Sequence, residues 1–305
     1  MSLSRIFGTC ALALGLTLGA CTTAPQPGWQ ARHIAGEQQR EAVRFAEDPL
    51  PDAWTGVDVR TTPVPLNDPD LEDGSGNLTY AGGVEITSGF NRLHGLSDIK
   101  FTDADSFYAV SDEGLLVRGQ VRLDPAGRLV GVEGVQVRPL TDPDGLPLLP
   151  KYLADAEGLA ILPGGDLLVS FEREHRVWRY DRDGRWRGER VIPDFPFTNN
   201  EGLEGITAYW DGTSYWAAGE NGGLWMCWEV CEVGIVPPPV PPTDSDLRVT
   251  SLASTDEGVF VLSRAYHADR NTNTVQIGHL VFALDRLDSG PPVYLQALAT
   301  WTAPA

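Results

Sequence analysis

Short apolar runs separated by polar turn sequences recur along the chain, and the clearest set lies within residues 155–181. The runs in this segment cover residues 158–162, 167–171 and 177–180. The sequence Pro-Gly-Gly-Asp at residues 163–166 separates the first two runs, and these residue types favour a tight turn. Runs of this length between turn signals are typical of antiparallel strands rather than of helices.

Acidic residues stand at matching ends of the predicted strands. Glu157 opens the first strand of the segment and Glu172 closes the second, so a hairpin brings the two carboxylates to one edge. Equivalent acids occur in two further hairpins, Asp98 with Asp112 and Glu204 with Glu220. The two acids of a hairpin are 14, 15 or 16 residues apart, so the spacing is nearly constant.

The hairpins repeat along the chain and thereby predict the architecture. Their first acids, at positions 98, 157 and 204, are 59 and then 47 residues apart. A weaker fourth copy at residues 249–264 lacks the first acid and has Arg264 in place of the second. Repeats of about 40 to 50 residues with several strands each are typical of β-propellers, whereas a two-sheet sandwich is the alternative. We expect an all-β fold, a β-propeller of five to six blades with six favoured.

The N-terminal residues have the pattern of an export signal. A basic start at Arg5 and an apolar run over residues 6–20 precede Cys21, an arrangement that resembles a bacterial lipoprotein signal. An ordinary cleavage site beside a chance cysteine is the alternative. We expect a signal peptide over residues 1–20, a tether over 21–52 and a single propeller domain over 53–305. Thr22, rather than Asp, predicts by the same resemblance an outer-membrane location facing the periplasm.

The net charge limits the binding partners expected for this protein, and the cysteine positions indicate a disulfide. The formal net charge of −19 argues against binding to nucleic acid or to anionic lipid surfaces, so membrane contact is expected through the lipid anchor only. Cys227 and Cys231 are expected to form a local disulfide in an exported protein, in preference to a metal site or a redox pair. The proline-rich residues 236–242 cannot form a central strand, so they are expected to connect blades.

The repeated acids are the strongest candidates for chemistry, because the sequence contains no G-x-S-x-G, H-E-x-x-H or phosphate-binding loop motif. Matching positions of a propeller meet at one end of the ring, and carboxylates gathered there repel one another unless a cation lies among them. Calcium prefers such oxygen ligands. The predicted ligands are Asp98, Asp112, Glu157, Glu204 and Glu220. The alternative is that these acids are ordinary strand-end residues paired with arginines.

Three basic residues are candidates for binding an anionic substrate. Arg264 stands where the other repeats carry an acid, and its planar guanidinium is suited to a phosphate or carboxylate. Arg173 and His267 are further candidates for the same role. Structural salt bridging is the alternative for each of the three.

The motifs also resemble a known family. The sequences LSDI and YAVSD at residues 96–112, DAEGLA and VSFE at 155–172, and NEGLEGI at 200–206 resemble the bacterial proteins called the esterase-like activity of phytase family. The resemblance covers about residues 84–286. It implies an exported, propeller-like protein that hydrolyses phosphoesters or esters. His94 departs from the pattern, because a second glycine is expected there.

Taken together, these features predict a lipid-anchored hydrolase of a small phosphoester or related ester. Calcium on the carboxylate rim would help to activate water, and Glu172 or Glu204 would be the general base. A sugar-lactone hydrolase with a similar metal centre is an alternative. A non-catalytic propeller lipoprotein that binds an envelope partner or ligand is another, and it leaves the enzymatic assignment uncertain.

Lipidation of Cys21 is directly testable. Cells that express the full chain with a radioactive or clickable fatty acid should incorporate the label into the wild-type protein and not into Cys21→Ser, because the thiol is the acceptor. Gel detection of the label is the measurement, and Cys10→Ser is the matched control. Retention of the label in Cys21→Ser would contradict the prediction.

Overall fold

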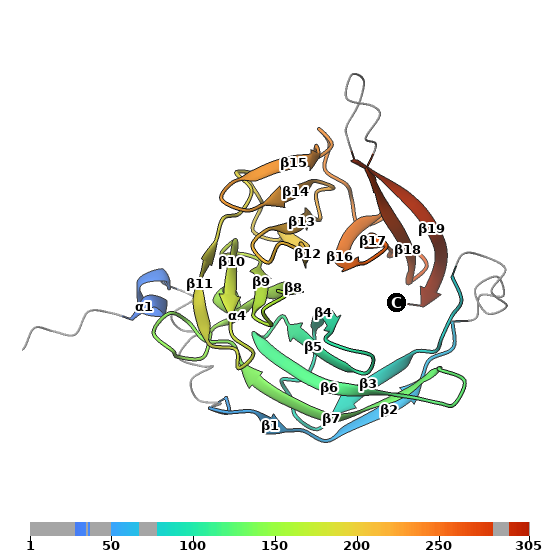
Figure 1. Ribbon diagram of the computed structural model, residues 1–305, viewed down its shortest axis with the longest axis horizontal. Helices are drawn as coiled ribbons and strands as arrows, with labels where there is room; N and C mark the ends of the chain where they lie inside the picture. Colours follow the sequence, from blue (N-terminus) through green and yellow to red (C-terminus); the bar gives the residue numbers. More distant parts are fainter. Residues whose placement is uncertain (1–27, 35, 37–49, 67–77, 283–292, 305) are drawn as a thin grey trace, which may run out of the picture.

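The computed structural model describes residues 28–34, 36, 50–66, 78–282 and 293–304. The predicted signal peptide, Cys21 and most of the predicted tether lie outside these residues. Four antiparallel sheets surround a central axis, which is the β-propeller arrangement expected from the repeats (Figure 1). Among the described residues, no helix combines the length and apolar character needed to cross a bilayer.

The four blades follow one another along the chain. Blade 1 contains β4 (Leu96–Phe101), β5 (Ser106–Ser111), β6 (Leu115–Leu123) and β7 (Leu129–Pro139), with β1 (Thr55–Gly56) at its outer edge. Blade 2 contains β8 (Ala156–Ile161), β9 (Leu167–Phe171), β10 (Arg176–Tyr180) and β11 (Trp186–Arg190). Blade 3 contains β12 (Leu203–Ala208), β13 (Tyr215–Gly219), β14 (Leu224–Cys227) and β15 (Cys231–Ile235). Blade 4 contains β16 (Arg248–Thr255), β17 (Gly258–His267), β18 (Thr272–Phe282) and β19 (Val293–Pro304).

The predicted five to six blades are wrong, because the described residues form four. Each hairpin found in the sequence is the inner hairpin of one blade. The extra length lies in long outer strands, such as the 12 residues of β19, and in connections between blades. The proline-rich segment lies in one of these connections, between β15 and β16, as expected. A separate two-stranded sheet pairs β2 (Val59–Pro63) with β3 (Val84–Ser88).

The hydrophobic core consists of layers between adjacent blades. One cluster joins Val110 and Leu116 of blade 1 to Trp178 of blade 2, and equivalent clusters lie between blades 2 and 3 and between blades 3 and 4. Middle strands are covered on both faces, so every residue of β9 is buried, whereas the outer β11 alternates between intermediate and exposed positions. The continuous apolar runs therefore mark strands that lie between two blades.

The inner strands β4, β8, β12 and β16 lie beside one another around the axis (Figure 1). Pairing of each inner strand with the second strand of its blade is irregular at the same place. The unpaired positions are Ser97, Glu157 with Gly158, Glu204 and Thr250. A β-bulge of this kind turns the extra side chain away from the regular alternation of the strand.

The residue after each bulge touches the next blade. A Cβ atom on Gly158 would lie 2.7 Å from the carbonyl oxygen of Glu204, and one on Gly205 would lie 3.1 Å from the backbone of Ser251. Only glycine permits so close an approach of two inner strands. In the other two blades this position is occupied by Asp98 and Ser251, whose side chains hydrogen-bond each other at 2.8 Å.

Asp98, one of the predicted metal ligands, connects blade 1 to blades 2 and 4. Its carboxylate accepts a 2.8 Å hydrogen bond from the backbone N–H of Leu159 in blade 2 and pairs with Lys100, which also reaches Ser251 at 3.2 Å. Burial raises the pKa of Asp98 and lowers that of Lys100, although their mutual attraction opposes both shifts. The bulge places Ser97, not Asp98, at the position equivalent to Glu157 and Glu204.

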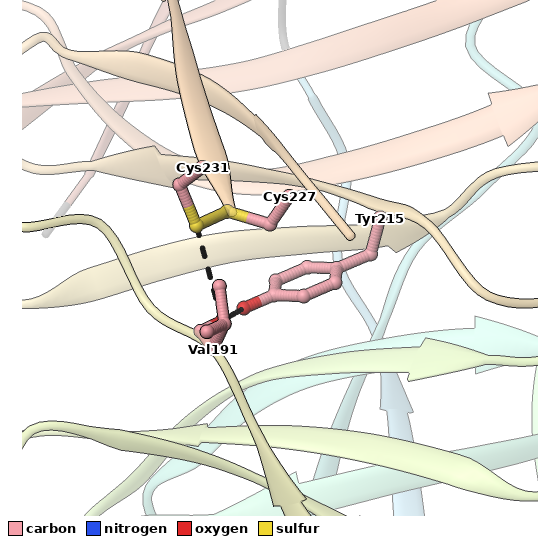
Figure 2. The surroundings of a disulfide bond; sticks show 4 residues. All are labelled: Val191, Tyr215, Cys227 and Cys231. Atoms are coloured by element: carbon pink, nitrogen blue, oxygen red, sulfur yellow. Dashed lines mark hydrogen bonds between the residues drawn. A yellow bond between two sulfur atoms is a disulfide. The ribbon is translucent and has the colours of Figure 1, made fainter. Parts of the chain in front are cut away.

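The predicted disulfide between Cys227 and Cys231 is confirmed. It joins β14 to β15, where the two cysteines face each other in register. Figure 2 shows the bridge above the carbonyl of Val191, which also accepts a hydrogen bond from the Tyr215 hydroxyl. Val191 follows the last strand of blade 2, so this corner connects blades 2 and 3.

Part of the segment predicted as a tether contacts the propeller. Trp29 of α1 (Trp29–His33) packs edge-on against Trp178 with ring centroids 4.7 Å apart. The Gln30 amide donates to Asp142 at 3.0 Å and accepts from the N–H of Leu149 at 3.0 Å. These contacts fix α1 beside β11 at the outer side of blade 2 (Figure 1).

The buried Asp98–Lys100 pair predicts a marked stability effect. Asp98→Asn should lower the free energy of unfolding by about 3–5 kcal/mol, because it leaves the Lys100 ammonium buried without a carboxylate. Replacing both residues, as Asp98→Asn with Lys100→Met, should cost less than the single change. Urea denaturation of the three proteins is the measurement. A loss below about 1 kcal/mol in the single variant would show that the pair does not hold the ring together.

Candidate functional site

One end of the ring forms an open cavity of about 480 Å³. Its lining comes from the bulges of β8, β12 and β16, from the residues after β9 and β13, from β17 itself, and from the segments that lead into β12 and β16. The lining residues are Glu157, Glu172, Asn200, Glu204, Glu220, Asp244, Arg248, Thr250, Arg264 and Tyr266. The cavity thus contains four glutamates from blades 2 and 3, and two arginines from blade 4.

The glutamates form a continuous cluster. Carboxylate oxygens of Glu172, Glu204 and Glu220 lie within 4.8 Å of one another, and so do those of Asp155, Glu157 and Glu172. Glu172 belongs to both groups and joins them. The sequence prediction that acids far apart along the chain gather at one mouth is therefore correct for these four glutamates.

Burial and mutual repulsion favour the protonated form of these carboxyls. Burial, reinforced by Asp155 and Glu172, raises the pKa of Glu157 to about 8. Burial and Asp155 likewise raise the pKa of Glu172 to about 7. The pKa of Glu204 lies well above its usual range for the same two reasons, and burial raises that of Glu220 although Arg248 opposes the shift. A cation at the cluster would relieve this repulsion.

The cluster fits calcium in the chemistry of its donors. All are carboxylate oxygens, and two ligands on opposite sides of one calcium ion lie about 4.6–5.2 Å apart. The separations of up to 4.8 Å within each group match this requirement. The Asn200 side chain lines the same cavity and offers a neutral oxygen.

Blade 4 supplies positive charge opposite the cluster. Arg248 donates to Glu220 at 2.5 Å and to Asp244 at 2.9 Å, and it lies 3.4 Å from Glu201. Arg264 pairs in register with Arg248 across β16 and β17, so the two guanidinium groups belong to neighbouring positions. The cavity is therefore acidic on one side and basic on the other.

The remaining predicted ligand, Asp112, forms an ion pair with a lysine. Lys151 of α4 (Lys151–Ala154) contacts Asp112 at 2.6 Å and Asp155 at 3.2 Å. Asp112 adds to the negative field that raises the pKa of Glu157, but it lies outside the two close groups of carboxylates.

The three predicted substrate-binding residues have different positions. Arg264 lines the cavity, as predicted. Arg173 has a left-handed backbone, with φ of 61°, and pairs with Asp155 beneath the rim. His267 hydrogen-bonds Thr274 at 2.9 Å and lies outside the cavity lining. Alternation along β17 explains this, because Arg264 and Tyr266 share one face and His267 lies on the other.

Arg248 and Tyr266 are cavity residues that the sequence reasoning missed. Aligning the fourth repeat on the bulge at Thr250 places Arg248 opposite Arg264, at the position held by Gly95, Asp155 and Gly202 in the other blades. Arg248 thus stood one residue before residue 249, where the sequence analysis had the fourth repeat begin. It was hidden because the fourth copy lacks the first acid.

The raised pKa values predict that metal-free protein loses stability with increasing pH. The protonated Glu157 carboxyl stabilises the fold fully below its ordinary pKa of 4.5, and this contribution is lost as pH rises through about 8. In chelator, the urea midpoint should fall between about pH 5 and about pH 8.

Glu157→Gln should flatten this pH dependence, since the amide cannot ionise. Glu257→Gln, on the exposed turn between β16 and β17, is the matched control and should leave the profile unchanged. A wild-type midpoint that rises over the same pH interval would contradict the assignment.

Comparisons with solved structures give propellers among low-similarity matches. Hydrazine synthase from Kuenenia stuttgartiensis matches with 14% identity and a TM-score of 0.35, over 68% of this chain and 50% of that one. The Cps50 (Swd1) β-propeller domain from Myceliophteria thermophila matches with 12% identity and a TM-score of 0.35, over 69% and 72%. A catalytically inactive virginiamycin B lyase from Staphylococcus aureus, solved with quinupristin, matches with 11% identity and a TM-score of 0.41, over 81% and 96%.

The chain spans half the length of the hydrazine synthase chain. No curated protein matches the sequence significantly. The family comparison covers residues 91–225, which include the inner hairpins of blades 1 to 3 and all four clustered glutamates. These residues match the phytase-like family, described as esterase-like activity of phytase, and the match confirms the resemblance found in the sequence.

Proposed function

We propose that this protein is a hydrolase of phosphoester or related ester bonds and that it uses calcium held by the clustered glutamates. The observation that carries the proposal is the cavity itself, in which Glu172, Glu204 and Glu220 approach within 4.8 Å and face Arg248 and Arg264. The family match over residues 91–225 supports an ester-hydrolysing reaction.

Glu204 and Glu220 are the proposed calcium ligands, with Asn200 as a further donor, and Glu172 beside them is kept for proton transfer. When bound there, calcium would screen the charge of a phosphoryl group and lower the pKa of a nearby water. Glu204 belongs to the group of three with Glu172 and Glu220, and the negative charges of Glu157 and Glu220 add to burial in raising its pKa. Asp98 and Asp112 have no place in this assignment, because neither belongs to the groups of close carboxylates.

Proton transfer is assigned to a cavity carboxylate. Glu172 is the first candidate for general base, because burial and Asp155 bring its pKa to about 7, where a carboxylate can accept and release a proton at neutral pH. A hydrolytic water would lose its proton to Glu172 as its oxygen bonds to phosphorus or to the acyl carbon. The ester P–O or C–O bond would then break, and the leaving alcohol would take up the proton from Glu172. Glu204 remains the second candidate for this role.

Anion binding is assigned to blade 4. The guanidinium of Arg264 lines the cavity opposite the glutamates and offers paired N–H donors to a phosphate or carboxylate oxygen. Arg248 lies beside it and is held in place by Glu220 and Asp244. The placement of the substrate's charged group would thus be set by blade 4, and that of the water by blades 2 and 3.

The proposal includes where in the cell the protein lies. We propose that lipidated Cys21 anchors the protein to the outer membrane facing the periplasm. Lactones belong in the substrate screen, because a sugar-lactone hydrolase would use the same carboxylates and metal.

Calcium binding and hydrolysis test the proposal separately. Isothermal titration of the chelator-treated protein should detect calcium, and calcium should raise the melting temperature. Glu204→Gln should weaken calcium binding, because it removes one charged ligand from the group of three. Glu257→Gln is the matched control for loss of one negative charge.

Hydrolysis should be measured on chromogenic phosphoesters, carboxyl esters and lactones, with and without calcium. Glu172→Gln should lower kcat by about 10²- to 10⁴-fold while the fold is retained, because the amide cannot accept a proton. A wild-type protein that binds no calcium and turns over none of these substrates would instead support the non-catalytic alternative.

A further inference from the structure

A second open cavity, of about 510 Å³, lies at the other end of the ring from the acidic cavity. All four blades contribute to it, through the far ends of their inner strands and the turns that follow. We call it the distal cavity. Its lining includes Ile99, Phe101, Ile161, Tyr209, Trp210 and Asp256.

The distal cavity is separate from the acidic cavity. Along β8, Glu157 lines the acidic cavity and Ile161 lines the distal one, so about 13 Å of strand lies between them. The N–H of Leu159, midway between these residues, is bonded to the buried carboxylate of Asp98. Among the described residues, none lines both cavities. A ligand of the distal cavity would therefore bind independently of the proposed hydrolysis.

Large apolar side chains remain exposed in the distal cavity. Trp210 is 79% exposed, Phe101 53% and Ile99 47%. Large apolar side chains that gather on one exposed surface mark a binding site more often than scattered ones do. Pockets for small molecules are lined mainly by apolar and aromatic side chains and measure about 300–1,000 Å³, and the distal cavity meets both conditions.

The backbone that carries Trp210 is held in place by its own turn. The carboxylate of Asp211 accepts hydrogen bonds from the backbone N–H groups of Thr213 at 2.8 Å and Ser214 at 2.7 Å. The Tyr209 ring lies beside the Trp210 ring, with centroids 5.4 Å apart. A turn fixed in this way loses little conformational freedom when a ligand binds, so less of the binding free energy is spent on ordering it.

The turns around the distal cavity are acidic. They contain six acids and no lysine or arginine, over residues 102–105, 163–166, 209–214 and 256–257. Asp166 is paired with Arg179, which leaves five acids around the opening. Lys100 lines the cavity, but it is already paired with Asp98. The charge of the surrounding turns therefore favours a cation.

Local hydrogen bonds keep two of these acids ionised. The side chain and backbone of Ser214, together with Thr213, lower the pKa of Asp211 to about 2. Backbone hydrogen bonds from Ser106 and Asp105 lower the pKa of Asp103. Both carboxylates are therefore charged at neutral pH, and the negative potential at this end of the ring does not depend on a bound metal.

We propose that the distal cavity binds a small organic ammonium ion, whose apolar part lies against Phe101 and Trp210 and whose charged nitrogen lies near Asp256. Ammonium groups are attracted to the face of an aromatic ring, and most strongly to tryptophan. An anionic ligand would be repelled by the acidic turns. A neutral apolar ligand would gain from burial alone.

Isothermal titration with three benzyl compounds tests the site in saturating calcium. The compounds are benzyltrimethylammonium, neutral benzyl alcohol and anionic phenylmethanesulfonate. The ammonium ion should bind at least about tenfold more tightly than benzyl alcohol, because charge attraction adds to burial of the ring. Phenylmethanesulfonate should bind more weakly than the alcohol. Equal affinities for the three compounds, or no binding of the ammonium ion, would overturn the assignment.

Two variants assign the contacts. Trp210→Ala should weaken binding of benzyltrimethylammonium by about tenfold while the fold is retained, because this side chain is exposed. Trp228→Ala is the matched control, since Trp228 is also exposed and lies outside the lining. Asp256→Asn should reduce the preference for the ammonium ion over benzyl alcohol, whereas Glu229→Gln, an equal loss of charge on the turn between β14 and β15, should not.

Calcium and Glu204→Gln distinguish the two cavities, because the acidic cavity also attracts cations. The affinity for benzyltrimethylammonium should be the same in calcium, in chelator and in Glu204→Gln. Displacement by calcium, or loss of binding in Glu204→Gln, would place the ammonium ion in the acidic cavity and overturn the distal site. Ammonium binding by a protein that binds no calcium and hydrolyses no ester would support the distal site and contradict the proposed hydrolase.

Discussion

The close contact between neighbouring inner strands is the constraint on which the rest of the structure depends. Each inner strand bulges at one position, and the following residue meets the next blade, as Gly158 meets Glu204 and Gly205 meets Ser251. Asp98 completes the ring through Leu159 and Ser251. Because four blades must close around the axis, the space between neighbouring inner strands determines which residue can follow each bulge.

The same bulges create the candidate site. An extra residue in the inner strand turns Glu157 and Glu204 toward the mouth of the ring, where the second strands deliver Glu172 and Glu220. Four carboxylates so near one another oppose ionisation, and burial strengthens the effect. The fold thus sustains an electrostatically unfavourable arrangement, which is the usual sign of a site that binds a cation or handles protons.

Blade 4 differs from the other three blades, because it contributes positive charge to the cavity where they contribute acids or glycine. Where the other blades have glycine or Asp155 it carries Arg248, and where they have acids it carries Arg264. The sequence neighbours of these arginines line an apolar cavity between blades 3 and 4. Charged and apolar side chains therefore alternate along β16 and line different cavities, because successive side chains of a strand point to opposite faces.

The sequence by itself determined the strands, the repeated hairpins, the Cys227–Cys231 bridge and the convergence of Glu157, Glu172, Glu204 and Glu220. These follow from local turn chemistry, apolar runs and repeat spacing, which act over short stretches of chain. Only the tertiary structure decided that four blades close the ring, because strand lengths and connections set how much chain each blade takes.

The tertiary structure also decided the role of individual acids. Asp98 and Asp112 look like Glu157 and Glu172 in the repeat, yet a one-residue bulge and two lysines give them other partners. The position of Arg248 in the cavity escaped the sequence reasoning because it depends on packing between blades 3 and 4. A pattern along one strand specifies which face a side chain takes, but not which side chain of another blade lies opposite it.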